Sequence, residues 1–143
     1  MAGDKPAVEE VAGPGEGVAV ARVLQLADVH VDLSYSPGSP AACGLPCCCM
    51  NSTGQAAEGE AAAGPWGEYS CDIPLRTLDT LLAAAREQEL DYIIYTGDSP
   101  AHDVWKQSKD RNLENELTVL DLIDSNFPGV PVYLGNNQLE CQL

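Results

Sequence analysis

Side chains that bind metals follow three segments of this 143-residue sequence that are expected to be strands. Asp28 and His30 follow the first segment, Asp98 the second and Asn136 the third. Carboxylate and imidazole groups are common ligands of divalent metals. Side chains alternate along an extended chain, so Asp28 and His30 are expected to point to the same side. Each motif alone is common by chance, but their succession at three strand ends predicts one metal site.

An alternation of strands and helices is expected to position these groups. The expected strands are 18–26, 91–96 and 130–133, and the expected helices are 73–88 and 109–125. The order strand, helix, strand, helix, strand predicts an α/β fold with a mainly parallel sheet and right-handed crossovers. Ligands of such sheets bind beyond the carboxyl ends of the strands, where the polar groups stand.

Apolar residues at steps of three and four mark one face of each expected helix. They are Leu75, Leu78, Leu82 and Ala85 in the first helix, and Leu113, Leu117 and Leu120 in the second. Asp72 is expected to cap the first helix, and Pro74 is tolerated in a first turn. Both apolar faces are therefore expected to cover the sheet.

The composition favours a single globular domain. Seven basic and 22 acidic residues give a net charge of −15, and 45 % of the residues are hydrophobic. No lysine or arginine lies between Arg22 and Arg76, so the chain has no basic surface pattern for nucleic acid. Its apolar stretches are shorter than the roughly 20 residues that a membrane span needs.

Five of the six cysteines lie within residues 43–71, four of them in a long segment, 34–70, that is expected to be a loop and the fifth directly after it. Such density is typical of disulfide-linked loops or of zinc clusters. Disulfides are favoured, because the segment has neither two separated C-x-x-C pairs nor histidines. Residues 1–17 are expected to form a disordered tail, and their acidic residues do not fit a secretory signal.

Longer segments around these motifs resemble the calcineurin-like metallophosphoesterases and, more closely, their acid sphingomyelinase branch. The family pattern is D-x-H, G-D and G-N-H. The most specific matches lie between Gly64 and Leu78 and between Tyr95 and Trp105, where the sequence reads Pro-Ala-His-Asp-Val-Trp. The likeness extends from Val23 to Tyr133. It implies a metallophosphoesterase-type core that hydrolyses sphingomyelin to ceramide and phosphocholine.

The resemblance also implies a site made of two zinc ions. Asp28 and His30 would hold one ion, Asp98 would bridge both, and Asn136 would bind the second. His102 matches a family histidine near the substrate phosphate, as an acid or a hydrogen-bond donor; the alternative is that it only satisfies a turn. Two cations clamping phosphate oxygens make the scheme physically coherent. The neighbouring Asp103 and Trp105 are expected to cap and pack a helix.

Cysteine pairing follows from the same resemblance. It implies the disulfides Cys43–Cys48 and Cys49–Cys71, and it leaves Cys47 and Cys141 outside the family pairing. Asn51 begins an Asn-Ser-Thr glycosylation sequon on the same loop. A lysosomal or extracellular location is implied, with a sphingolipid or another phosphodiester as substrate. Membrane contact is expected only in the full-length enzyme.

The sequence departs from the family pattern at its end. It has two histidines in all, and Asn137 stands where the third motif has histidine. Residues 18–133 are therefore expected to be the N-terminal part of the phosphoesterase domain and 134–143 a divergent or truncated tail. A truncated phosphodiesterase that is inactive alone is the first hypothesis. A noncatalytic interaction protein is the alternative.

Overall fold

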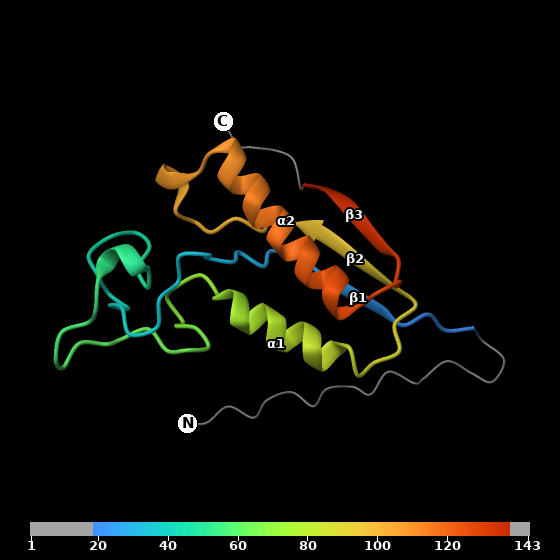
Figure 1. Ribbon diagram of the computed structural model, residues 1–143, viewed down its shortest axis with the longest axis horizontal. Coiled ribbons are helices and arrows are strands. Elements are labelled where there is room, and N and C mark those ends of the chain that lie inside the picture. Colours follow the sequence, from blue (N-terminus) through green and yellow to red (C-terminus); the bar gives the residue numbers. More distant parts are fainter. Residues whose placement is uncertain (1–18, 138–143) are drawn as a thin grey trace, which may run out of the picture.

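The computed structural model describes residues 19–137 and has an α/β fold, as predicted. Within these residues, three strands alternate with two helices of more than two turns (Figure 1). The elements in chain order are β1 (Val23–Leu26), η1 (Asn51–Thr53), α1 (Leu75–Ala85), β2 (Tyr92–Gly97), η2 (Val104–Lys106), α2 (Lys109–Asn126) and β3 (Val132–Asn137), where η marks a 3₁₀ helix. None of the described helices is long and apolar enough to cross a membrane.

The three strands form one parallel sheet in the order β1-β2-β3, which confirms the predicted sheet type. Val23 pairs with Tyr92, and Ile93 pairs with Val132. The register shifts between Tyr95 and Gly97, near the end of β2. Parallel strands place their carboxyl ends at one edge of the sheet. The segments that follow β1 and β2 therefore start side by side.

One hydrophobic core joins the sheet to both helices, which lie side by side in Figure 1. On β2, Ile93 and Tyr95 are fully buried against them, because alternate residues of a strand share a face. The opposite face carries Tyr92 and Tyr133, whose rings meet edge to face at 5.6 Å. Tyr133 remains 59 % exposed, so apolar surface faces solvent on that side of the described chain.

All three strands have bounds that differ from the expected ones, and β2 is shifted by one residue at each end. β1 begins at Val23, because the pairing of β1 with β2 starts at Val23 and Tyr92. The preceding residues of the two strands, Arg22 and Asp91, are joined by hydrogen bonds but lie outside both strands. β3 begins two residues later than expected and continues through Asn137. The expected tail at 134–143 therefore starts inside a strand, while residues 1–18 and 138–143 lie outside the described part.

The two helices differ in how well their apolar pattern predicted the buried face. α1 buries Leu78 and Leu82, as expected. The expected face of α2 is confirmed only at Leu120, which packs against the core, because Leu113 and Leu117 are about half exposed. The residues that α2 buries are Asn115, Glu116, Val119, Ile123 and Asn126. Two of these polar side chains satisfy groups beyond the strand ends, which explains why the helix turns them inward.

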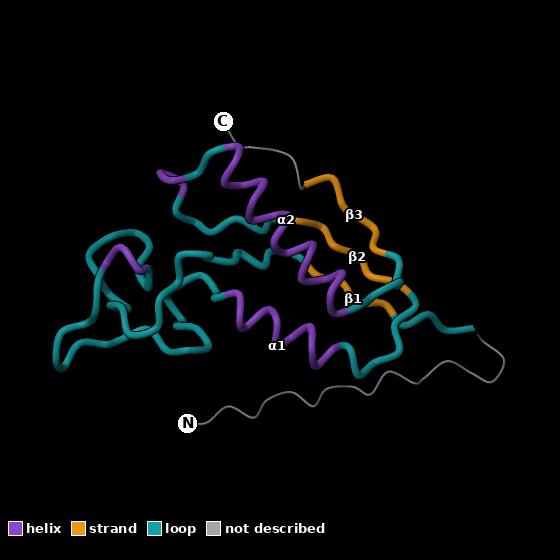
Figure 2. Tube along the Cα trace, viewed as in Figure 1, coloured by secondary structure: helices purple, strands orange, loops and turns teal. Residues whose placement is uncertain are grey.

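Residues 34–70 form a long loop beyond the start of α1, as Figure 2 shows. Only η1 interrupts it, and the predicted disulfides Cys43–Cys48 and Cys49–Cys71 are both present. Their four thiols are consumed as disulfides, so the zinc-cluster alternative is wrong for them. Within the described residues Cys47 forms no disulfide and is half-buried, and Cys141 lies outside them.

A buried hydrogen-bond network connects β2 to α2. The hydroxyl groups of Tyr95 and Ser99 are hydrogen-bonded to each other, and the Ser99 hydroxyl also donates to Glu116 Oε2. The other carboxyl oxygen of Glu116 is buried and accepts no hydrogen bond. Burial raises the pKa of Glu116, and the Ser99 hydrogen bond opposes this shift more weakly. The folded protein therefore favours the neutral carboxylic acid more than the unfolded chain does.

Glu116 should make the protein more stable in acid than at neutral pH. A glutamate in the unfolded chain ionises near its ordinary pKa of 4.5. Because folding raises this pKa, the stabilisation is complete below that pH and is lost as the pH rises through the folded pKa. Urea unfolding at pH 4.5 and 7 is expected to show this decline. Glu116→Gln, which stays neutral, should flatten the decline, whereas Glu114→Gln at an exposed neighbouring position should preserve it. An equal decline in both variants would contradict this assignment.

Candidate metal centre

Three of the predicted ligands meet at the carboxyl ends of β1 and β2. One potential ligand atom from each of Asp28, His30 and Asp98 lies within 4.8 Å of the others. The expected meeting of these three residues beyond the strand ends is confirmed, whereas their role as ligands stays a prediction. Asp28 is exposed, and the other two side chains are partly buried. The group is therefore open to solvent on one side and supported by the sheet on the other.

The backbone that carries these ligands is not extended, which corrects the expected reason for their convergence. Asp28, His30 and Asp98 have φ values of 53°, 36° and 63°, in the left-handed region. Side-chain alternation therefore does not apply to them. Such backbone costs of order 1–3 kcal/mol per residue and clusters at functional sites. Here it is held by hydrogen bonds from Asp28 N to Gly97 O (3.0 Å) and from His30 N to Asp98 O (3.3 Å).

The imidazole of His30 is oriented by a carbonyl group on the neighbouring strand exit. Its Nδ1 lies 2.9 Å from the Pro100 carbonyl oxygen, which can only accept a hydrogen bond. Nδ1 therefore carries the proton in the neutral ring. Nε2, 3.6 Å from Asp98 Oδ2, keeps its lone pair. This is the arrangement by which proteins prepare a histidine for a metal, since the second nitrogen fixes tautomer and ring direction.

His102 lies beside this group, with its ring centroid 4.0 Å from that of His30. Its Nδ1 is 2.7 Å from Asp72 Oδ1, and its backbone N–H donates to Asp72 Oδ2, also at 2.7 Å. The expected capping role of Asp72 is therefore wrong. Pro74 is the N-cap residue of α1, and no side chain caps it. Sequence periodicity missed this contact, because Asp72 and His102 are 30 residues apart.

The side chain of Asp103 does not cap a helix as expected, and the packing role of Trp105 stays a prediction. The Asp103 carboxylate makes no capping hydrogen bond to η2, although its residue precedes that helix. It is 98 % buried and forms an ion pair with Arg111 of α2 at 3.0 Å. A buried carboxylate needs such a partner to offset its desolvation. Trp105 is half exposed.

Close contact between β2 and β3 explains the glycine of the third motif. A Cβ atom added to Gly135 would lie 2.9 Å from the Cα atom of Thr96, closer than packed atoms tolerate. Glycine thus lets β3 approach β2 at this point. Asn136 follows in the strand, and the Cα of Asn137 pairs with that of Gly97. The backbone of β3 therefore ends beside the exit of β2, and the ligand role of Asn136 stays a prediction.

Asp32, two residues after His30 in the sequence, is influenced by other acidic side chains. Asp32 is buried, and its Oδ1 accepts a hydrogen bond from Ser34 N at 2.7 Å. Burial raises the pKa of Asp32, and the charges of Asp103 and Asp72 raise it further, against the effect of the Ser34 hydrogen bond. A cation bound nearby would reduce this repulsion between carboxylates. The local charge thus suits a positively charged ligand.

The donor set of the triad fits a divalent metal. Two carboxylates and one imidazole are ligands that zinc accepts, typically in a site of four ligands. The three ligand atoms lie near enough to one another to share one ion after small side-chain movements. The described residues thus provide a possible metal-binding triad at the edge of the sheet.

Sequence comparisons identify relatives of this chain, although no protein-family model matches it. Human sphingomyelin phosphodiesterase is 42 % identical over 123 residues, which are 83 % of this chain and 20 % of the relative. Sphingomyelin phosphodiesterase A of Dictyostelium discoideum is 39 % identical over 120 residues, 81 % of this chain and 19 % of the relative. Cyclic GMP-AMP phosphodiesterase SMPDL3A of Bos taurus is 30 % identical over 133 residues, 89 % of this chain and 28 % of the relative.

The resemblance inferred from the motifs is thus confirmed by several relatives. The chain spans about one fifth of the length of the sphingomyelin phosphodiesterases that it matches. The three relatives are named for different substrates, but all are named as phosphodiesterases. By sequence, this chain is therefore a relative of the sphingomyelin phosphodiesterases, aligned with about one fifth of their length.

Proposed function

We propose that this chain supplies metal-binding and phosphate-binding groups for zinc-dependent phosphodiester hydrolysis. The observation that carries the proposal is the convergence of Asp28, His30 and Asp98 at one sheet edge, with His102 beside them. Bound zinc polarises phosphate oxygens and lowers the pKa of a coordinated water. His102 is placed to donate a hydrogen bond to the phosphate or a proton to the leaving alkoxide.

The substrate that we propose is a sphingolipid, or another phosphodiester, because the relatives carry such names. Two disulfides suit a lysosomal or extracellular location, where thiols are oxidised. Asn51 is exposed at the start of η1 and is proposed as a glycosylation site. Contact with a membrane surface belongs to the full-length enzyme in this proposal, and nucleic acid is not a partner.

The 143-residue chain alone is expected to bind one zinc ion weakly and not to hydrolyse sphingomyelin. Three ligands can hold one ion, whereas clamping a phosphodiester between two metals needs both ions in fixed geometry. Purified chain with excess zinc would be titrated calorimetrically and assayed at acid and neutral pH. Sphingomyelin and a chromogenic phosphodiester are the substrates. Turnover that Asp98→Ala abolishes would show that the described motifs suffice for catalysis.

A noncatalytic interaction protein is the second candidate function. The observation that favours it is the exposed apolar surface of β3, where Tyr133 and Leu134 are both more than half exposed. Exposed apolar patches of this kind mark surfaces that other proteins cover. Failure of the chain to bind zinc in the titration would favour this candidate over the first.

A further inference from the structure

The carboxylate of Asp72 makes both of its hydrogen bonds to one residue. One oxygen accepts from the backbone N–H of His102, and the other lies 2.7 Å from the imidazole Nδ1 of the same residue. The carboxylate is 14 % exposed, whereas the imidazole is 62 % exposed. The largely buried carboxylate of Asp72 therefore holds the solvent-accessible imidazole of His102 on its protein-facing side.

The chain around Asp72 is itself firmly held. The preceding residue, Cys71, is linked by a disulfide to Cys49. The following residue, Ile73, bridges to Val31, and its carbonyl oxygen accepts a hydrogen bond from Asp32 N. Both neighbours of Asp72 are thus tied to other segments, so its carboxylate has little freedom to follow a moving partner.

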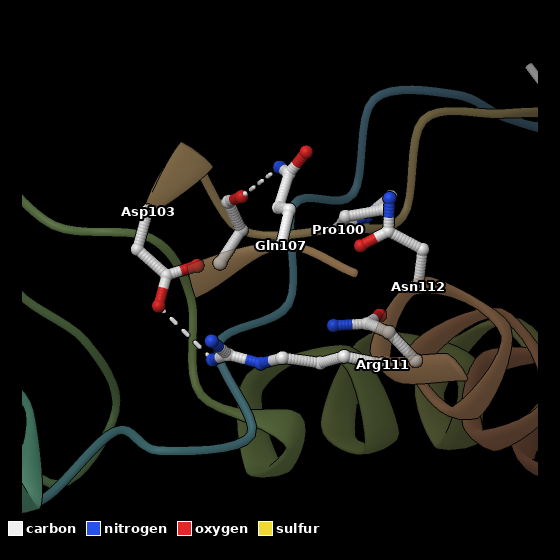
Figure 3. A pocket seen from close by; sticks show the side chains of 7 residues that line it. Pro100, Asp103, Gln107, Arg111 and Asn112 are labelled. Carbon is white, nitrogen blue, oxygen red and sulfur yellow. Dashed lines mark hydrogen bonds and ion pairs between the residues drawn. The ribbon is translucent and has the colours of Figure 1, made fainter. Parts of the chain in front are cut away.

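The backbone on either side of His102 is fixed as well. Figure 3 shows Gln107 among the side chains that line a small pocket beside η2 and α2, and its amide donates to the Ala101 carbonyl oxygen at 2.9 Å. On the other side, Arg111 reaches the Asp103 carboxylate at 3.0 Å. The remaining freedom of His102 lies in its side-chain torsions and in the position of its ring proton. Asp72 contacts Nδ1 of this ring. A hydrogen bond at Nδ1 restricts the side-chain torsions and also decides which ring nitrogen carries the proton.

We propose that Asp72 is a positioning residue that holds the proton of the neutral His102 ring on Nδ1, so that Nε2 is the ring atom that takes up a second proton and donates it to a substrate phosphate or to the leaving alkoxide. A carboxylate can only accept, so the nitrogen that faces it must carry the proton. Nε2 is then left on the edge of the ring away from Asp72, beside the His30 ring. The identity of the ligand as a phosphate rests on the function proposed above; the tautomer does not.

A purely structural contact would not require this arrangement. The bond from Asp72 Oδ2 to the backbone N–H already joins the two segments, whatever the ring does. The second bond adds control of an exposed imidazole next to the metal-binding triad. Hydrogen bonding at one ring nitrogen decides which nitrogen is available for chemistry at the other. The ring contact therefore points to a role in ligand binding.

The proposal can be tested on the metal-free chain by ¹⁵N nuclear magnetic resonance, at a pH where both imidazoles are neutral. The chain has two histidines, so His30 serves as an internal reference. In the wild-type chain both rings are expected to be Nδ1–H tautomers. Asp72→Asn turns an acceptor into an amide that can donate to Nδ1, so His102 should change to the Nε2–H tautomer. His30, which bonds to the Pro100 carbonyl oxygen, should not change.

Asp124→Asn is the matched control, because it removes one negative charge from an exposed position of α2. It should leave both tautomers unchanged. An Nε2–H tautomer of His102 in the wild-type chain would overturn the proposal, even if Asp72→Asn failed to fold. So would an unchanged His102 tautomer in a folded Asp72→Asn chain, where the His30 signals report folding.

A second measurement separates positioning from the proposed function. With zinc present and at a pH where the wild-type His102 ring is cationic, Asp72→Asn is expected to weaken binding of inorganic phosphate about tenfold, because the cationic ring loses its charge-assisted hydrogen bond to Asp72. Unchanged phosphate affinity together with an inverted tautomer would overturn the positioning role. If the wild-type chain binds neither zinc nor phosphate, the proposed function fails, and the tautomers still decide whether Asp72 controls His102.

Discussion

Asp98→Asn is expected to weaken zinc binding by the 143-residue chain about 100-fold. Asp98 is the member of the triad that faces His30 Nε2, at 3.6 Å from its carboxylate. Replacing a group that only supports a metal ligand typically lowers metal affinity 10–100-fold. Removing the charge of a ligand itself should therefore lower zinc affinity by at least the upper end of this range. Isothermal titration calorimetry with zinc, at a pH where His30 is neutral, measures the change.

The choice of asparagine keeps this test free of a backbone effect. Asp98 has a φ of 63°, where asparagine and aspartate are tolerated and alanine is strained. The Asp98→Asn variant should therefore retain the backbone and the side-chain shape while losing the charge. Asp124→Asn, with the same charge change at an exposed site, should alter zinc affinity less than about twofold by long-range attraction alone. Equal losses in both variants would mean that zinc is attracted by the net charge of −15 and not held by the triad.

The approach of Asp28, His30 and Asp98 could be predicted from the sequence because it depends on topology. The apolar runs that form β1 and β2 and the helix between them require parallel strands with neighbouring ends. Residues directly after those strands then meet, whatever their backbone conformation. The conformation itself could not be predicted, because left-handed backbone at Asp28 is imposed by a hydrogen bond to Gly97. That bond exists only once both strands are in place.

The inward polar residues of α2 could not be predicted for a different reason. Glu116 and Asn115 look like solvent-facing residues in a helical pattern, because their burial depends on partners far away in sequence. Asn115 donates to the Val31 carbonyl oxygen, and Glu116 accepts from Ser99. Periodicity carries no information about such partners. Leu113 and Leu117 also follow the helical spacing of a buried face, so the apolar pattern alone assigned two exposed leucines to the buried face of α2.

The relation between Asp72 and His102 was also hidden from the sequence. An aspartate two residues before a proline that precedes a helix is a normal candidate for a cap. The disulfide that the family resemblance implied holds the adjacent residue, Cys71, to Cys49 and so fixes the chain where Asp72 meets His102. The pairing of the cysteines was thus the signal that could have placed Asp72 near the site.

Removal of the Cys49–Cys71 disulfide is expected to have the largest effect on the stability of the fold. In the chain-entropy description, a cross-link stabilises a protein by restricting its unfolded state, and more so for longer loops. For the separation of 22 residues between Cys49 and Cys71, this gives about 3.4 kcal/mol. For the separation of five between Cys43 and Cys48, it gives about 2.1 kcal/mol. The chain thus offers two disulfides of different span in one loop.

The double variants Cys49→Ala with Cys71→Ala, and Cys43→Ala with Cys48→Ala, are compared by urea unfolding under non-reducing conditions. The longer cross-link should cost more, by roughly 1 kcal/mol. Its loss should also release the chain beside Asp72, so His102 should lose its fixed tautomer only in the Cys49/Cys71 variant. Peptide mapping of the wild-type chain checks the pairing, and a disulfide to Cys47 would contradict it. Equal destabilisation with His102 unchanged in both variants would show that the disulfide next to Asp72 is independent of the site.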